Sequence, residues 1–157
     1  YQTNEAMPDA LIKKLQQSNT FNQGFITVEY LAASFLDMDW HTLSENATQD
    51  ALAFEDASMQ GIGLIPEILP RYRSPYFSHI FAGGYSSGYY SYIWAQVLDA
   101  DAFQAFKETD LFDQKTADAF LQHVLSQGGK AEPMTLYKRF RGAEPKVDAL
   151  LQRKGFQ

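Results

Sequence analysis

The sequence contains no cysteine, and basic residues are few. Without cysteine, disulfides, thiolate metal sites and cysteine nucleophiles are excluded. The 13 basic residues stand against 19 acidic ones, and the net charge of -6 provides no attraction for nucleic acid or for an anionic membrane. We therefore expect neither nucleic acid nor a membrane as a partner. The absence of cysteine, together with the absence of a visible signal sequence, favours a cytoplasmic location.

Long apolar runs are also missing, since no stretch approaches the roughly 20 residues that a membrane-spanning helix needs. The 157 residues suffice for one domain with a buried core, and we expect a single domain over residues 1–157. Because the chain starts at Tyr1 rather than at Met, we expect that an upstream segment has been removed.

Helical periodicity accounts for most of what is present. Apolar residues recur at steps of three and four, which predicts helices over residues 8–17, 21–43, 49–61, 86–106, 113–126, 135–141 and 145–154. Pro66, Pro70 and Pro75 interrupt residues 64–81, which we expect to be a connector, in part extended. The sequence therefore predicts an all-α protein, an irregular multi-helix bundle.

Familiar catalytic motifs are absent. His41, His79 and His123 have no spacing that places two ligands on one helical face, and neither HExxH nor GxSxG occurs, so we predict no metal site in this chain. The carboxylate pairs are typical of solvated helix faces and are Asp37/Asp39, Glu55/Asp56 and Asp99/Asp101.

The informative segment is residues 77–94, FSHIFAGGYSSGYYSYIW. If a helix begins near Ser86, Tyr85, Tyr89 and Tyr92 lie on one side of it, with His79 just before them. Phenol and imidazole groups can donate hydrogen bonds to an oxyanion that develops on a peptide carbonyl. The alternative is that the tyrosines pack in a helix core and that His79 is an ordinary, partly buried histidine. The spacing alone leaves both interpretations open.

This segment resembles the carboxy-terminal signature of the family that comprises thimet oligopeptidase, oligopeptidase A and peptidyl-dipeptidase, in which a histidine precedes GGY and several tyrosines follow. Its spacing is most similar to that of the bacterial peptidyl-dipeptidases. Similarity continues in residues 19–25 (NTFNQGF), 36–41 (LDMDWH) and 137–142 (YKRFRG). The resemblance thus covers nearly the whole chain.

The resemblance implies that the chain is part of the two-lobed catalytic domain of a zincin-type (gluzincin) peptidase. Zinc would be bound in the full-length parent by HExxH and a later Glu, upstream of Tyr1, and not by this fragment. By the same resemblance, His79 and Tyr85 are catalytic residues that bind substrate and stabilise the transition state. The chain alone is then expected to be inactive.

Further substrate-binding residues follow from the resemblance. Tyr92 matches an additional active-site tyrosine, and Tyr89 is a weaker candidate. Gly83 and Gly84 would give the loop of Tyr85 the freedom to close over a bound peptide.

The function implied is zinc-dependent hydrolysis of short peptides with release of C-terminal dipeptides. The partners implied are short peptide substrates and the missing N-terminal part of the same enzyme. A different class of function stays open beside it, namely a non-catalytic helical domain whose tyrosine-rich face binds a partner protein.

Overall fold

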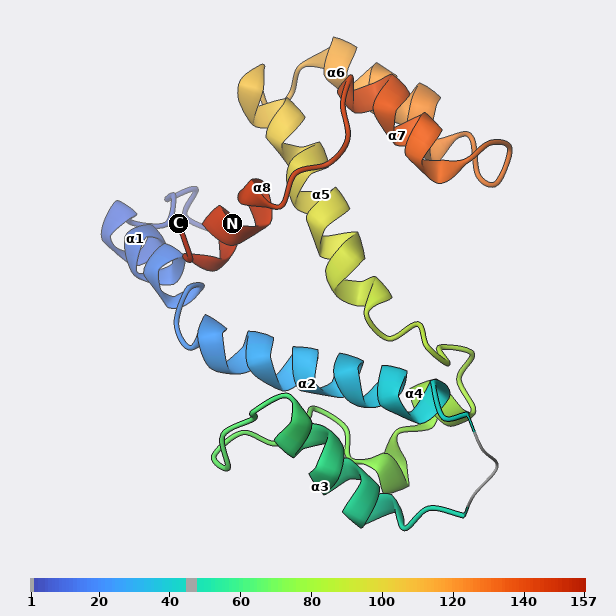
Figure 1. Cartoon of the computed structure of the whole chain (residues 1–157). Helices are drawn as coiled ribbons and strands as arrows, with labels where there is room; N and C mark the ends of the chain where they lie inside the picture. The colour runs from blue at the N-terminus through green and yellow to red at the C-terminus, as the bar shows by residue number, and fades with distance from the viewer. Residues whose placement is uncertain (1, 45–47) are drawn as a thin grey trace. The chain divides into compact units, whose positions relative to one another are not determined.

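The computed structural model describes residues 2–44 and 48–157, which form helices joined by loops (Figure 1). Its elements are α1 (Asp9–Ser18), α2 (Gln23–His41), α3 (Ala51–Gly61), the 3₁₀ helix η1 (Ser74–Tyr76), α4 (Ser78–Phe81), α5 (Ser91–Glu108), α6 (Gln114–Phe120), the π-helix η2 (Leu121–Leu125), α7 (Pro133–Arg141) and α8 (Asp148–Lys154). No strand occurs in these two ranges, and the all-α prediction is confirmed.

The chain divides into two compact units, residues 1–92 and 93–157. The single domain expected over residues 1–157 stays a prediction. None of the helices in the described part of the chain has the length and apolarity needed to cross a bilayer.

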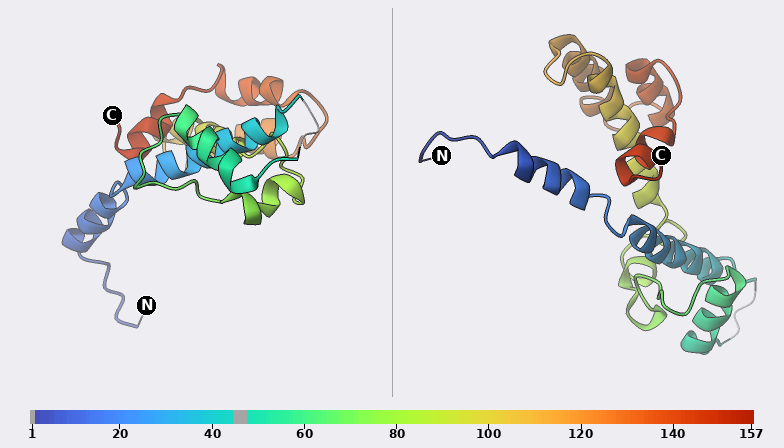
Figure 2. Two further views of the ribbon diagram at one scale, coloured as in Figure 1. Left: turned by 60° about the horizontal axis from the view of Figure 1, so that its bottom comes forward. Right: turned by 90° about the vertical axis from the view of Figure 1, so that its left-hand side faces the viewer.

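The core of the first unit lies between α2, α3 and the connector that follows them. Helices α2 and α3 lie side by side in Figures 1 and 2. Its buried apolar residues are Ala32, Ala33, Leu36, Met59, Phe77, Ile80 and Tyr89. The aromatic rings of Trp40 and Phe54 pack at the side of this core, with their centroids 4.0 Å apart. The predicted connector is thus folded against α2, with η1 and α4 where an extended segment was expected.

In the first two helices, burial is confined to the middle of α2. Residues 32–34, 36 and 37 are buried, whereas Phe25, Val28 and Phe35 on the same helix are exposed. Helix α1 contains no buried residue, although its leucines have the helical spacing of an amphipathic helix. Periodicity identified the helices correctly but did not identify which apolar side chains this unit covers.

The interpretation of the three carboxylate pairs as solvated was wrong for one member of each pair, because Asp37, Glu55 and Asp101 are almost completely buried. Glu55 accepts hydrogen bonds from Arg73 Nε and from the backbone N–H of Ser74, which fixes the start of η1. Desolvating a carboxylate is costly unless hydrogen bonds replace water, and here they do.

In the second unit, α6 and α7 pack against α5 through aromatic rings, and both contact η2. The rings of Phe106, Phe120 and Phe140 meet with centroids 5.0 to 6.4 Å apart. The buried carboxylate of Asp101 accepts a hydrogen bond of 2.6 Å from the Tyr137 hydroxyl. Asp113 caps α6, since its side chain accepts the N–H of Thr116.

The core of the first unit yields a test of stability. Replacing the fully buried Leu36 by Ala leaves a cavity and is expected to lower the free energy of unfolding by about 2–5 kcal/mol. The same change at Leu11, which is half-exposed on α1, should alter it by about 0.5 kcal/mol or less. Urea unfolding followed by Trp40 fluorescence in a Trp94→Phe background measures both. Equal effects of the two substitutions would contradict the assignment of the core.

Candidate functional site

The segment between α4 and α5 is a series of turns, and α5 begins at Ser91 rather than near Ser86 as predicted. The backbone N–H of Tyr85 donates to the carbonyl of His79 at 3.0 Å. The hydroxyl of Ser86 donates to the carbonyl of Ile80 at 2.6 Å. These bonds fold the segment back onto α4, and residues 83–89 are hereafter called the tyrosine loop. His79 and Tyr85 are thereby brought together without a continuous helix.

The glycine pair makes this fold possible. A Cβ added to Gly83 would lie 2.9 Å from both Cα and O of His79, so only glycine allows the loop to approach α4 so closely. Gly84 has φ of 78°, in the left-handed region that favours glycine. Closure of this loop over a peptide stays a prediction.

Asp37 on α2 anchors the loop from the opposite side. Its Oδ1 accepts the N–H of Ser87 at 3.0 Å, and its Oδ2 accepts the N–H of Tyr89 at 2.9 Å. His41 Nδ1 lies 2.9 Å from Oδ1 and 2.8 Å from the backbone carbonyl of the same Asp37. The carbonyl of Tyr89 in turn accepts the hydroxyl of Tyr30 at 2.6 Å. Helix α2 therefore holds the loop through both carboxylate oxygens and a phenol.

His79 lies in an aromatic enclosure. Its ring centroid is 4.7 Å from that of Tyr72, 5.7 Å from that of Tyr89 and 6.2 Å from those of Phe77 and Tyr85. The side chain is partly exposed, but Nδ1 is enclosed and has no hydrogen-bond partner among the described residues. This arrangement leaves Nε2 as the ring nitrogen that can bind a ligand. A proton on Nε2 makes it a donor.

Tyr85 and Tyr92 form a pair at the surface, each with a side chain a little over one-third exposed. Their rings stack with centroids 5.3 Å apart and an interplanar angle of 20°. A hydrogen bond between the two side chains raises the pKa of Tyr92, and burial adds to the effect. A phenol hydroxyl can both donate and accept a hydrogen bond, so Tyr92 can donate to Tyr85. With Tyr92 as the donor, the hydroxyl proton of Tyr85 is free for an external acceptor.

Tyr89 differs from its two neighbours because its side chain is only 3% exposed and belongs to the core. Burial raises the pKa of its phenol from 10.0 to about 12, with a contribution from the neighbouring Tyr72. The three tyrosines therefore do not share one exposed helical face, because α5 starts later than predicted. Substrate binding by Tyr89 stays a prediction.

Sequence reasoning missed Asp37, Tyr30 and Tyr72. A signal for Asp37 was available, since it follows Ala33 by one helical turn and so continues the apolar side of α2. An acid on an apolar stripe indicates a buried carboxylate with a specific partner. No comparable spacing pointed to Tyr72, which lies in the irregular connector.

The described residues offer no metal centre. Across residues 2–44 and 48–157, no three His, Asp or Glu side chains are grouped so that they could hold a metal ion. The donors near His79 are phenols and a single imidazole, which do not make a zinc ligand set.

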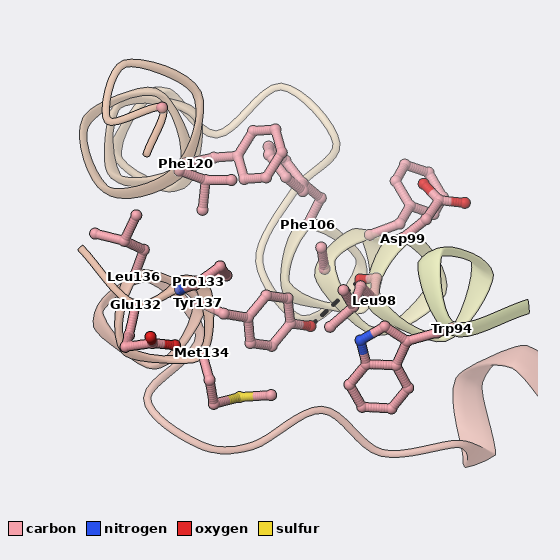
Figure 3. Close-up of a pocket in the computed structure, with 14 residues that line it drawn as sticks. Trp94, Leu98, Asp99, Phe106, Phe120, Glu132, Pro133, Met134, Leu136 and Tyr137 are labelled. Carbon is pink, nitrogen blue, oxygen red and sulfur yellow. Dashed lines mark hydrogen bonds between the residues drawn. The ribbon is translucent and has the colours of Figure 1, made fainter. Parts of the chain in front are cut away.

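An apolar cavity of about 660 Å³ lies within the second unit and includes no residue of the tyrosine loop. Figure 3 shows Tyr137 reaching from α7 towards α5, where its hydroxyl lies 3.3 Å from the carbonyl of Leu98. Trp94, Phe106 and Phe120 add aromatic walls. The cavity is lined mainly by apolar and aromatic side chains and supplies few polar groups.

Comparison with known proteins identifies the class to which this arrangement belongs. Residues 1–156 match peptidase family M3, and the chain therefore belongs to that family. The resemblance inferred from residues 77–94 is confirmed.

Individual relatives agree with this assignment. The chain is 42% identical over 157 residues to dipeptidyl carboxypeptidase of Escherichia coli strain K12, with 99% of this chain and 23% of that protein aligned. It is 40% identical to oligopeptidase A of Haemophilus influenzae, again with 99% of this chain and 23% of the relative covered. For oligopeptidase A of Escherichia coli the identity is 39%, with 100% and 23% covered. The chain thus spans less than a quarter of the length of these relatives.

The buried phenol gives a pH-dependent prediction. Because folding raises the pKa of Tyr89 from 10.0 to about 12, its neutral form contributes stability that is complete below pH 10 and is lost as pH rises through about 12. The free energy of unfolding should therefore fall over this interval, and Tyr89→Phe should make the fall smaller. Urea unfolding at a series of alkaline pH values measures it. An identical fall in both proteins would show that Tyr89 ionises normally.

Proposed function

We propose that this chain supplies one half of the active site of a family M3 metallopeptidase, the half that binds the carbonyl oxygen of the scissile peptide bond. The observation that carries the proposal is the fixed pairing of His79 with Tyr85. Their rings are 6.2 Å apart, both side chains are partly exposed, and Tyr92 forms a hydrogen bond with Tyr85. Membership in a peptidase family favours this enzymatic role over the interaction domain considered from the sequence.

In the proposed mechanism, His79 Nε2 and the Tyr85 hydroxyl donate hydrogen bonds to the substrate carbonyl oxygen. Attack on the carbonyl carbon moves negative charge onto this oxygen, so both bonds strengthen in the transition state. Tyr92 holds the Tyr85 hydroxyl in orientation. Donors that are fixed before reaction need no reorganisation while it proceeds.

The zinc ion implied by the family resemblance has no fitting ligand set among the described residues. We therefore assign its ligands, and the residue that activates water, to the remainder of a longer protein. The relatives, of which this chain covers 23%, leave ample length for such a segment. No reaction step is assigned to zinc within this chain.

The proposed substrates are short peptides, from which C-terminal dipeptides would be released. Support comes from the 42% identity to a dipeptidyl carboxypeptidase and from the spacing of residues 77–94. Oligopeptidase A, at 40% identity, makes cleavage within oligopeptides the competing specificity. A cytoplasmic location stays a prediction based on the absence of cysteine.

The role of Tyr85 predicts a specific kinetic effect in the full-length peptidase. Tyr85→Phe removes one oxyanion donor and is expected to lower kcat about 10²–10³-fold with little change in KM. Tyr90→Phe is the matched control, because Tyr90 is exposed close by in the sequence and belongs to no contact of the proposed site. Steady-state hydrolysis of a short peptide measures both variants. Equal kcat values for the two would refute the proposed role of Tyr85.

The chain by itself is expected to be inactive, because it lacks the metal-binding half of the site. Peptide hydrolysis by the purified 157 residues in the presence of zinc would be measured against the same chain carrying His79→Ala. Turnover that requires zinc and disappears with His79→Ala would show that the chain is a complete enzyme.

A further inference from the structure

We infer that Asp37 is the positioning residue of this site, and that its carboxylate determines where Tyr85 lies relative to His79. The catalytic consequence rests on the function proposed above. The structural part of the inference, that Asp37 fixes the tyrosine loop, stands on the contacts alone.

Both carboxylate oxygens of Asp37 accept hydrogen bonds from the tyrosine loop. Ser87 and Tyr89, whose N–H groups they accept, follow Tyr85 by two and four residues. The donors come from a segment 50 and 52 residues away in sequence, so these are tertiary contacts and not local helix capping. The side chain of Asp37 is fully buried, which means that no water competes for the two oxygens.

The loop conformation needs such an anchor. Ser87 has φ of 55°, a left-handed conformation that is unfavourable for a residue with a Cβ. Sequence periodicity favours a helix that begins near Ser86, and the observed turns depart from that preference. The bonds from the N–H groups of Ser87 and Tyr89 to Asp37 offset the cost. The local bonds from Tyr85 and Ser86 to α4 hold the start of the loop, and the bonds to Asp37 hold its end.

His41 ties the same carboxylate to α4. Its Nδ1 lies 2.9 Å from Asp37 Oδ1, and its ring packs against Phe81 with centroids 5.9 Å apart. Phe81 is the last residue of the short helix that carries His79. Asp37 and His41 therefore connect both catalytic candidates to one turn of α2.

Asp101 provides a matched comparison in the other unit. It is a buried aspartate of similar exposure, but its partners are the side chains of Tyr137 and Arg141. Replacing it by Asn tests what the loss of a buried carboxylate does in general. Only Asp37→Asn should disturb the tyrosine loop.

Asn at position 37 retains one acceptor oxygen, so either Ser87 or Tyr89 loses its partner and faces an amide NH₂ instead. A displacement of catalytic groups by about 1 Å can reduce a rate by about 10²-fold. We expect Asp37→Asn to lower kcat of the full-length peptidase by about 10- to 100-fold, with KM changed by less than about threefold. Asp101→Asn should leave kcat per folded molecule unchanged.

A double-mutant cycle shows whether Asp37 acts through Tyr85. The Tyr85→Phe variant lacks the hydroxyl that Asp37 positions. Adding Asp37→Asn to this variant should therefore lower kcat only slightly further. Additive losses of kcat would overturn the inference, as would equal kcat values for Asp37→Asn and Asp101→Asn.

If Asp37→Asn does not fold, His41→Ala replaces it, because His41→Ala removes one partner of the same carboxylate oxygen. Alone, His41→Ala should lower kcat several-fold, whereas in the Tyr85→Phe background it should change kcat little. An additive loss of kcat would overturn the inference.

Amide hydrogen exchange in the 157-residue chain separates this inference from the proposed function. Asp37→Asn, or His41→Ala in its place, should accelerate exchange at the amides of Ser87 and Tyr89 by more than about tenfold, whereas Asp101→Asn should not. If the exchange rates at Ser87 and Tyr89 did not change, Asp37 would not be the anchor of the loop, whatever the kinetic results. Accelerated exchange together with wild-type kcat for Tyr85→Phe would refute the proposed function and leave the anchor in place.

Discussion

The interaction on which the rest of the site depends is the acceptance of two distant backbone N–H groups by the buried carboxylate of Asp37. Its position is fixed because its neighbour Leu36 packs in the core with Phe77 and Ile80. Ile80 belongs to α4, the helix of His79. One hydrophobic core thus sets the distance between the anchor on α2 and the helix on which the tyrosine loop folds.

The sequence predicted the helices well, because apolar periodicity reports local structure directly. It failed at Ser86, where the helical pattern continues but the chain turns until Ser91. Tertiary hydrogen bonds to Asp37 determine that conformation, and spacing within residues 77–94 contains no information about a partner 50 residues earlier. The burial of Glu55 and Asp101 was missed for the same reason, since their partners are also distant in sequence.

The candidate site was predicted in part. Resemblance selected His79 and Tyr85, and the structure brings their rings to 6.2 Å. Spacing alone grouped Tyr89 with Tyr85 and Tyr92, whereas the structure buries Tyr89 and pairs the other two. Gly83 also has a structural role that spacing did not indicate, because it permits the close approach of the loop to His79. These differences follow from packing, which composition and periodicity do not describe.

The proposed function requires that His79 and Tyr85 together bind the carbonyl oxygen of the peptide bond under attack. A crystal structure of the full-length peptidase with a phosphinic peptide, whose tetrahedral centre mimics the attacked carbonyl, tests it most directly. We expect one phosphinate oxygen about 2.7–3.1 Å from both His79 Nε2 and the Tyr85 hydroxyl, with the bonds from the loop to Asp37 intact. A bound phosphinate that neither residue contacts would contradict it.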